Sequence, residues 1–120
     1  MSTSVKEHTS LPLLRRWESA LHDLLDDTES FPKRIRYSFV ARIDNHALEI
    51  LEQLQVARYA TQHRELEALK VADQSLAKLK VLMRVTYSRG YISSKRYERH
   101  VVCFEEVGRM LGGWIKSCYT

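Results

Sequence analysis

The ten residues Val107–Lys116, VGRMLGGWIK, decide the fold predicted for this chain, because they combine a helical apolar pattern with three glycines and a tryptophan. Each glycine costs about 1 kcal/mol relative to alanine in a helix interior. On a helical wheel Gly108 and Gly112 share one face, and this small-xxx-small spacing lets a neighbouring helix approach closely. The stretch therefore predicts a tightly packed helix in an all-α protein.

Apolar residues recur at three- and four-residue spacing along the rest of the chain, which is typical of amphipathic helices. Start signals stand at Ser10–Pro12 and Ser30–Pro32, Gly90 is a candidate C-cap, and Ser93 or Ser94 is a candidate N-cap. The predicted helices span residues 11–29, 33–60, 64–89 and 94–117.

Short connections between these helices predict an antiparallel up-down-up-down four-helix bundle. The polar break at residues 61–64 contains neither glycine nor proline, so the second and third helices either stop there or only bend. A chain of 120 residues holds one ordinary domain, which we expect to span residues 1–120.

The composition, with 44% hydrophobic and 28% charged residues, is that of a soluble globular protein. No apolar run approaches the roughly 20 residues that a membrane span needs, and the N-terminus lacks the apolar segment of a secretory signal. We therefore expect a cytoplasmic protein without membrane contact. Cys103 and Cys118 would lie about 22 Å apart on one helix, so they are expected as small buried side chains rather than as a disulfide.

The third and fourth predicted helices each carry apolar residues outside the stripe that faces the core. On the fourth helix a second stripe lies roughly 100° from the first. A monomer would leave this surface exposed, which soluble monomers avoid, so we expect contact with other subunits; a tilted bundle that buries the stripe internally is the alternative. The residues expected at the interface are Leu82, Val85, Cys103, Val107, Met110 and Trp114.

Positive charge collects in the second half of the chain. Residues 78–99 contain seven basic side chains and one acidic one, and residues 33–36 add three more cations. In an up-down-up-down bundle these two segments meet at one end, where they predict sequence-independent contacts with the phosphates of RNA or DNA. The residues expected to bind nucleic acid are Lys33, Arg34, Arg36, Lys78, Arg84, Arg89, Lys95, Arg96 and Arg99.

Two further features bear on this basic end. The acidic residues Asp23, Asp26, Asp27 and Glu29 belong to the same end, and they are expected to neutralise part of its charge. The tyrosines interleaved with the cations either stack on unpaired bases or simply border the core. They are Tyr37, Tyr87, Tyr91 and Tyr97.

Catalytic and metal-binding patterns are missing from the sequence. No histidine has a glutamate three residues before it, as inward-facing metal sites of helical bundles require. The chain also lacks a phosphate-binding loop and a metal-ligand spacing of Cys and His. We therefore predict a protein that is not an enzyme and that has no metal and no cofactor.

Three motifs carry a resemblance to a known family: the Phe-Pro-Lys-x-x-Arg run at Phe31–Arg36, the pair Ala72-Asp73, and the run Val107–Ile115. Over residues 14–117 the chain resembles the four-helix-bundle proteins related to the accessory variability determinant (Avd) of diversity-generating retroelements. It is also similar to proteins encoded within intervening sequences of bacterial 23S ribosomal RNA genes, but the segment Asp44–Glu49 favours the Avd side.

The resemblance implies a basic homopentameric barrel that binds nucleic acid and the reverse transcriptase of the retroelement. In that system the complex converts template RNA into mutagenised cDNA, which replaces a repeat in a target gene. The implied function is a non-catalytic accessory role in mutagenic retrohoming. The alternatives are an oligomeric scaffold and a ribosomal-RNA-associated protein outside a retroelement.

Overall fold

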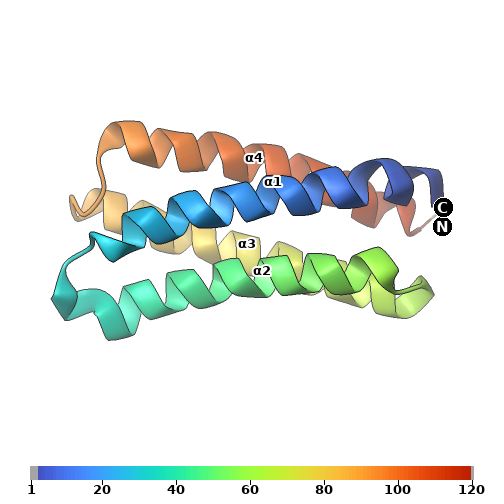
Figure 1. Cartoon of the computed structure of the whole chain (residues 1–120), viewed down its shortest axis with the longest axis horizontal. Coiled ribbons are helices and arrows are strands. Elements are labelled where there is room, and N and C mark those ends of the chain that lie inside the picture. Colours follow the sequence, from blue (N-terminus) through green and yellow to red (C-terminus); the bar gives the residue numbers. More distant parts are fainter. Residues whose placement is uncertain (1–2, 120) are drawn as a thin grey trace.

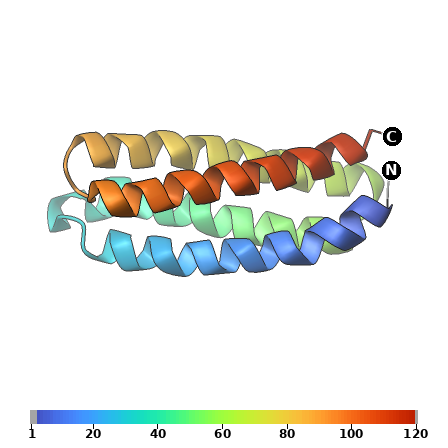
Figure 2. The same ribbon diagram turned by 90° about the horizontal axis from the view of Figure 1, so that it is seen from above.

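The structure, a computed structural model, describes residues 3–119. It contains four long helices that run antiparallel to their neighbours (Figures 1 and 2): α1 (Thr3–Glu29), α2 (Ala41–Tyr59), α3 (Gln62–Ser88) and α4 (Ser94–Ser117). Two short helical turns, η1 (Lys33–Ile35) and η2 (Arg36–Val40), join α1 to α2. The prediction of an all-α chain with four helices is confirmed, and the described residues contain no strand.

The core lies between one face of each helix, and α4 packs on α1 and α3. Its two largest side chains, Trp17 and Trp114, are fully buried. The predicted apolar stripe of the first helix is buried as expected, and Trp17 Nε1 donates a hydrogen bond of 2.8 Å to the carbonyl oxygen of Ala47 on α2. Burying each large apolar side chain contributes about 1.5–3 kcal/mol, so this core accounts for the stability of the bundle.

The predicted end of α3 and start of α4 are confirmed. Gly90 adopts a φ of 77°, its N–H bonds to the Tyr87 carbonyl at 2.9 Å, and the Tyr91 N–H bonds to the Thr86 carbonyl at 2.9 Å. This pair of bonds is the Schellman motif, which needs a left-handed residue after the helix. The Ser93 hydroxyl then caps α4 by accepting a 3.2 Å bond from the Arg96 N–H, so Ser93 rather than Ser94 is the cap.

The predicted start of the first helix is wrong. The helix begins at Thr3 and contains Pro12 in its interior, where the sequence pattern had placed Pro12 in the first turn. Proline in a helix interior costs about 3 kcal/mol, and tertiary contacts offset this cost. Ser10 is buried, and Lys6 Nζ donates a 2.5 Å bond to the Ala60 carbonyl at the α2–α3 connection.

The predicted second helix also needs correction at its first turns. Residues 33–40 are helical but not α-helical, because η1 is a 3₁₀ turn and η2 is a π-helical turn. At the other end α2 stops rather than bends: Ala60 and Thr61 are extended, and Gln62 has a φ of 51°.

The face of α4 that points into the core is wider than predicted, since Phe104 and Leu111 of the first stripe are buried as expected and the second stripe is buried too. The second stripe of α4, which was expected to contact other subunits, is buried inside the protomer: Cys103, Val107 and Trp114 are 5%, 0% and 0% exposed. Trp114 Nε1 also donates a 2.7 Å hydrogen bond to Glu65 Oε2 on α3. These three side chains have no surface left for another subunit, so their assignment to an oligomer interface is wrong. Leu82, Val85 and Met110 are half-buried, and their interface role stays a prediction.

The glycines of α4 do not mediate close helix packing within the chain. A Cβ atom at Gly112 would meet nothing within 4 Å, and one at Gly108 would lie 3.8 Å from Leu76 Cδ2 and Lys80 Nζ. The expected close approach of a neighbouring helix at these positions is therefore absent from the described residues.

Candidate nucleic-acid interface

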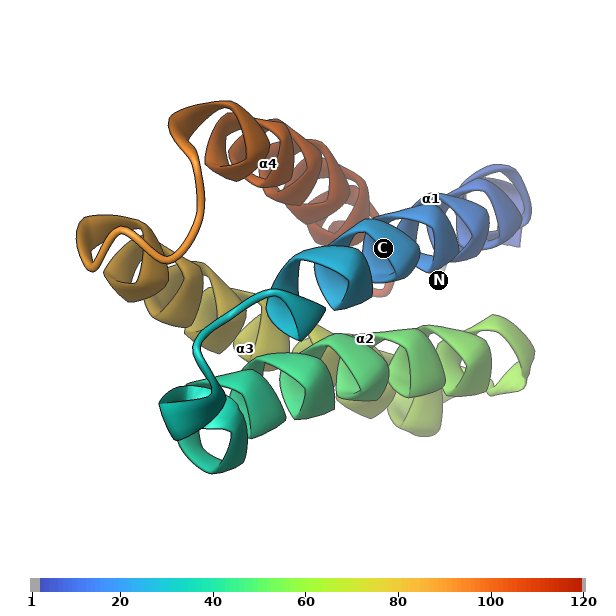
Figure 3. The ribbon, with the colours of Figure 1, turned by 60° about the vertical axis from the view of Figure 1, so that its left-hand side comes forward.

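The basic segment at residues 33–36 and the part of the second basic segment that follows α3 lie at one end of the bundle (Figure 1), as predicted. The α1–α2 and α3–α4 connections form this end (Figures 1 and 3), which we call the basic end. A hydrogen bond of 2.8 Å from Arg34 Nη2 to Tyr91 Oη joins the two connections directly. Residues 57 positions apart in the sequence are thereby brought into contact.

Tyr91 holds two arginines at once. Arg34 Nη2 and Arg89 Nε donate to the same Tyr91 oxygen at 2.8 and 3.4 Å, and both guanidinium carbons lie 5.9 Å from the centre of the tyrosine ring. The pKa of the Tyr91 phenol is lowered, chiefly by the hydrogen bond from Arg89 and further by the charges of both arginines. The Schellman motif after α3 fixes the backbone of Tyr91, so a local turn positions this nonlocal contact.

This arginine pair is available to an anion. Among the described residues no carboxylate lies within ion-pair distance of Arg34 or Arg89, and both side chains are exposed. Each guanidinium has five N–H donors and Tyr91 uses one of each. Two guanidiniums anchored on one oxygen are close enough to bind the same phosphate group, which guanidinium forks bind well.

Arg96 and Arg99, by contrast, are paired with acidic residues of α1. Arg96 donates a short hydrogen bond to Asp27, which is buried, and Asp27 Oδ2 also lies 2.5 Å from His100 Nε2. Arg99 Nη2 bonds to Asp23 Oδ2 at 3.2 Å. The expectation that the acidic segment neutralises part of the basic end is confirmed for Asp23 and Asp27. Both arginines lie at the predicted end, but carboxylates already occupy them.

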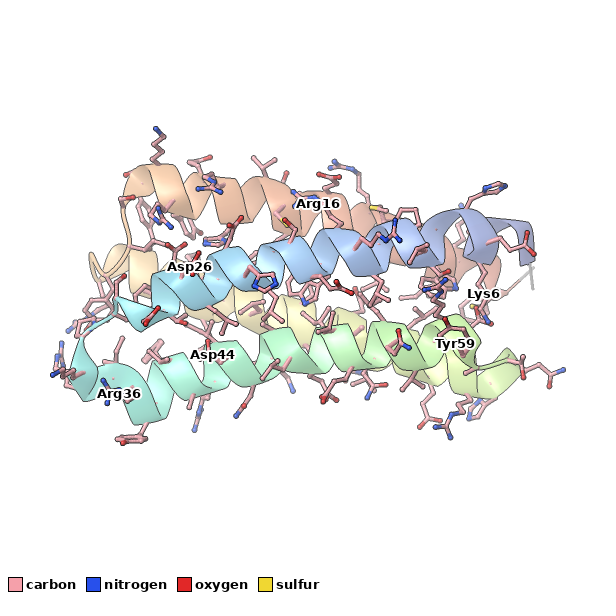
Figure 4. The ribbon with its side chains drawn as sticks, in the orientation of Figure 1. Lys6, Arg16, Asp26, Arg36, Asp44 and Tyr59 are labelled. Carbon is pink, nitrogen blue, oxygen red and sulfur yellow. The ribbon has the colours of Figure 1, made fainter. Side chains whose placement is uncertain are left out.

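The other predicted cations divide into two groups. Three of them are exposed at the basic end: Lys33, Arg36 and Lys95. Figure 4 shows Arg36 there, closer to the end of the bundle than Asp44 on α2. Lys78 and Arg84 lie instead along the shaft of α3. The pKa of His46 on α2 is lowered by burial first and then by Lys78, so Lys78 faces the α2 side of the bundle.

Arg84 lines a groove between α3 and α4 with a volume of about 620 Å³. The groove also contains Lys80 and Arg109, while Asp73 and Glu105 oppose them. This mixture of charges makes the groove a weaker anion site than the basic end.

A buried glutamate and two cysteines, Cys103 buried and Cys118 half-buried, lie outside the basic end. Glu65 is fully buried near the opposite end of the bundle, and Lys6 Nζ approaches its Oε2 atom at 3.8 Å. The thiols of Cys103 and Cys118 are both free, and burial raises the pKa of each. Their thiols are therefore poor nucleophiles.

Within residues 3–119 no group of three or more His, Cys, Asp or Glu side chains is arranged to hold a metal ion. Across the same residues, no helix combines the length and the apolarity needed to cross a bilayer.

Sequence reasoning missed two residues of the interface. Tyr91 was expected either to stack on a base or to border the core, but it organises Arg34 and Arg89. His100 was not considered, although it shares Asp27 with Arg96. Both roles depend on contacts between residues far apart in the sequence; the acidic segment of α1 signalled the contact at Asp27, and no sequence signal pointed to the role of Tyr91.

The molecule described so far is a four-helix bundle whose one end presents arginines without carboxylate partners. Residues 12–118 match the model of a protein family described as bAvd-like. Because this match covers most of the chain, the protein belongs to the bAvd-like family. A search of curated proteins found no match.

Proposed function

We propose that this chain is a non-catalytic accessory subunit of a diversity-generating retroelement, which binds RNA or DNA through its basic end and supports the reverse transcriptase in mutagenic retrohoming. Membership of the bAvd-like family supports the accessory role. The observation that carries the nucleic-acid part is the pair Arg34 and Arg89, which share Tyr91 and have no carboxylate partner among the described residues.

The arrangement of this pair suits a phosphate for an energetic reason. Holding a flexible arginine in place costs side-chain entropy. Because Tyr91 already holds both arginines in the free protein, a ligand does not have to order them when it binds. A phosphate that binds both guanidiniums then gains charge-assisted hydrogen bonds and releases counterions. Because phosphates recur along every nucleic acid, such binding is independent of sequence.

The proposed assembly is a homo-oligomer, a pentamer by resemblance, in the cytoplasm. The side chains offered for its contacts are the half-buried Leu82, Val85 and Met110, together with Val81 and Val102, which are 48% and 60% exposed. A ring of copies would place several basic ends side by side and raise the local positive potential.

A scaffold without affinity for nucleic acid is the second candidate function. The ion pairs of Arg96 with Asp27 and of Arg99 with Asp23 favour it, because they lower the charge available at the basic end.

The test is binding of fluorescein-labelled single-stranded RNA, measured by fluorescence anisotropy over a range of salt concentrations. We expect the double variant Arg34→Gln/Arg89→Gln to weaken binding about tenfold and to reduce the slope of log K against log salt by about 0.7, since the one phosphate that both guanidiniums contact is no longer neutralised. The control Arg58→Gln/Arg64→Gln removes the same charge near the α2–α3 connection and should leave the slope unchanged.

Equal effects of the two double variants would show that the RNA does not contact the arginine pair. No binding by the wild-type protein would leave the scaffold function. A reverse-transcriptase gene beside this one, and co-purification of its product with this chain, would test the partner separately.

A further inference from the structure

Four tyrosines lie near the basic end, and the structure uses three of them internally. Tyr87 and Tyr97 stack on each other with ring centres 4.3 Å apart and planes 2° from parallel. Tyr91 holds the two arginines, and its ring also lies 6.4 Å from that of Phe31. Tyr37 is 90% exposed and makes no hydrogen bond or ring contact with any residue between 3 and 119.

The helical turns η1 and η2 explain why Tyr37 points away from the bundle. Ile35 is buried and Phe39 is half-buried against the core, so these two side chains anchor the segment. Tyr37 lies midway between them and is directed into solvent. An aromatic ring this exposed forgoes about 1.5–3 kcal/mol that burial would provide, and no hydrogen bond or ring contact with the described residues compensates for it.

Positively charged residues precede this ring closely in the sequence. Lys33, Arg34 and Arg36 lie one to four residues before Tyr37, all three are exposed, and none forms an ion pair with another described residue. An aromatic ring among unpaired cations is the combination by which proteins hold single-stranded nucleic acid: the cations contact phosphates and the ring stacks on a base.

We propose that Tyr37 is a stacking site for an unpaired base, so that the basic end selects single-stranded over double-stranded nucleic acid. The inference rests on the proposed function and specifies its substrate class. A duplex covers the faces of its bases, and Tyr37 reaches no base there. Every base has an aromatic face, so the site accepts any sequence.

The charges favour nucleic acid over another protein subunit as the partner of this ring. Two copies meeting through this segment would bring six exposed cations together, which like-charge repulsion opposes. A polyanion gains from the same three cations.

The experiment compares Tyr37→Ala, Tyr37→Leu and Tyr37→Phe with the control Tyr59→Ala. Tyr59 is 69% exposed beside Arg58 and lies at the opposite end of the bundle from Arg36, as Figure 4 shows. Anisotropy is measured with three probes of equal length: oligouridylate, the same strand with abasic sites, and an RNA duplex.

We expect Tyr37→Ala to weaken oligouridylate binding about tenfold, as loss of one base–aromatic stack does. Tyr37→Leu should weaken it similarly, whereas Tyr37→Phe keeps the ring and should stay close to wild type. Binding of the abasic strand and of the duplex should not change, and the salt slope with oligouridylate should remain that of the wild type, because no charge is removed. Tyr59→Ala should have no effect on any probe.

Three results would overturn the stacking site and leave the proposed function intact: unchanged oligouridylate binding by Tyr37→Ala, equal weakening with all three probes, or a smaller oligomer by light scattering, which would place the ring between subunits. Absence of RNA binding by the wild-type protein would overturn both proposals together.

Discussion

Two pairs of arginines lie at the same end of the bundle and differ in what holds them. Arg96 and Arg99 on α4 bind the carboxylates of Asp27 and Asp23 on α1. Arg34 and Arg89 bind the neutral phenol of Tyr91. The first pair ties two helices together with its charge neutralised. The second pair is held in place with its charge available, so position in the fold alone does not separate arginines that are neutralised by the fold from arginines whose charge is open to a ligand.

The largest expected effect concerns the first pair. Asp27 is buried and accepts hydrogen bonds from Arg96 and His100, so Asp27→Ala leaves both partners unpaired at the α1–α4 contact. Losing one partner of a buried ion pair costs about 3 kcal/mol. Urea unfolding followed by circular dichroism measures this loss.

The control for this variant is Asp26→Ala, since Asp26 is the neighbouring exposed carboxylate. We expect it to change the free energy of unfolding by less than about 0.5 kcal/mol. Similar destabilisation by both variants would mean that general charge, not the buried contact, stabilises this end.

A smaller effect is expected when Arg99 is released from its carboxylate. Asp23 and Arg99 are both partly exposed, so their ion pair contributes little to stability. Asp23→Asn converts Arg99 into an arginine like Arg34, available to a phosphate. RNA affinity should rise about threefold relative to Asp26→Asn, and the salt slope should steepen by about 0.7. Equal gains in the two variants would show that only net charge matters.

The smallest effect is expected at Asp44. Its carboxylate accepts a hydrogen bond from a hydroxyl group, whereas Asp23 and Asp27 are paired with arginines. Thr28 Oγ1 donates to Asp44 Oδ1 at 3.0 Å. Burial raises the pKa of Asp44, and the bond from Thr28 opposes this shift only partly. Because the folded-state pKa lies above the unfolded value, ionised Asp44 destabilises the fold at neutral pH, and this penalty disappears as the pH falls through these pKa values.

Asp44→Asn retains an oxygen for Thr28 and removes the charge. It should raise the unfolding free energy at pH 7 by about 0.5 kcal/mol, and the gain should vanish below about pH 4. Thermal unfolding of both proteins at the two pH values measures the difference. A gain independent of pH would contradict an electrostatic origin.

The sequence predicted the helix ends correctly where one residue type determines the backbone conformation or the cap. Gly90 fixed the end of α3 because left-handed backbone favours glycine, and Ser93 fixed the start of α4 because its hydroxyl satisfies a free N–H. Pro12 misled the prediction, because contacts made by Lys6 and Ser10 outweigh its local preference for a first turn.

The core-facing side of α4 was not predictable from its own pattern. Two apolar stripes about 100° apart fit a helical wheel equally well, and the core takes side chains from both, because α1 and α3 pack against α4 on the side between them. The hydrogen bond from Trp114 to Glu65 belongs to this arrangement, and no pattern within α4 contains that information. The same holds for Tyr91, whose partners come from two distant segments.

The π-helical turn at Arg36–Val40 accommodates one residue more than an α-helical turn, since its bonds span five residues instead of four. Deleting a single residue there would remove the extra residue and turn the cationic connection at residues 33–36 by about 100° around the axis of α2, while α1 stays packed on the core. The buried side of α2 would keep its register during such a change. Relatives that differ by one residue at this turn would therefore share a core and aim their cationic ends in different directions.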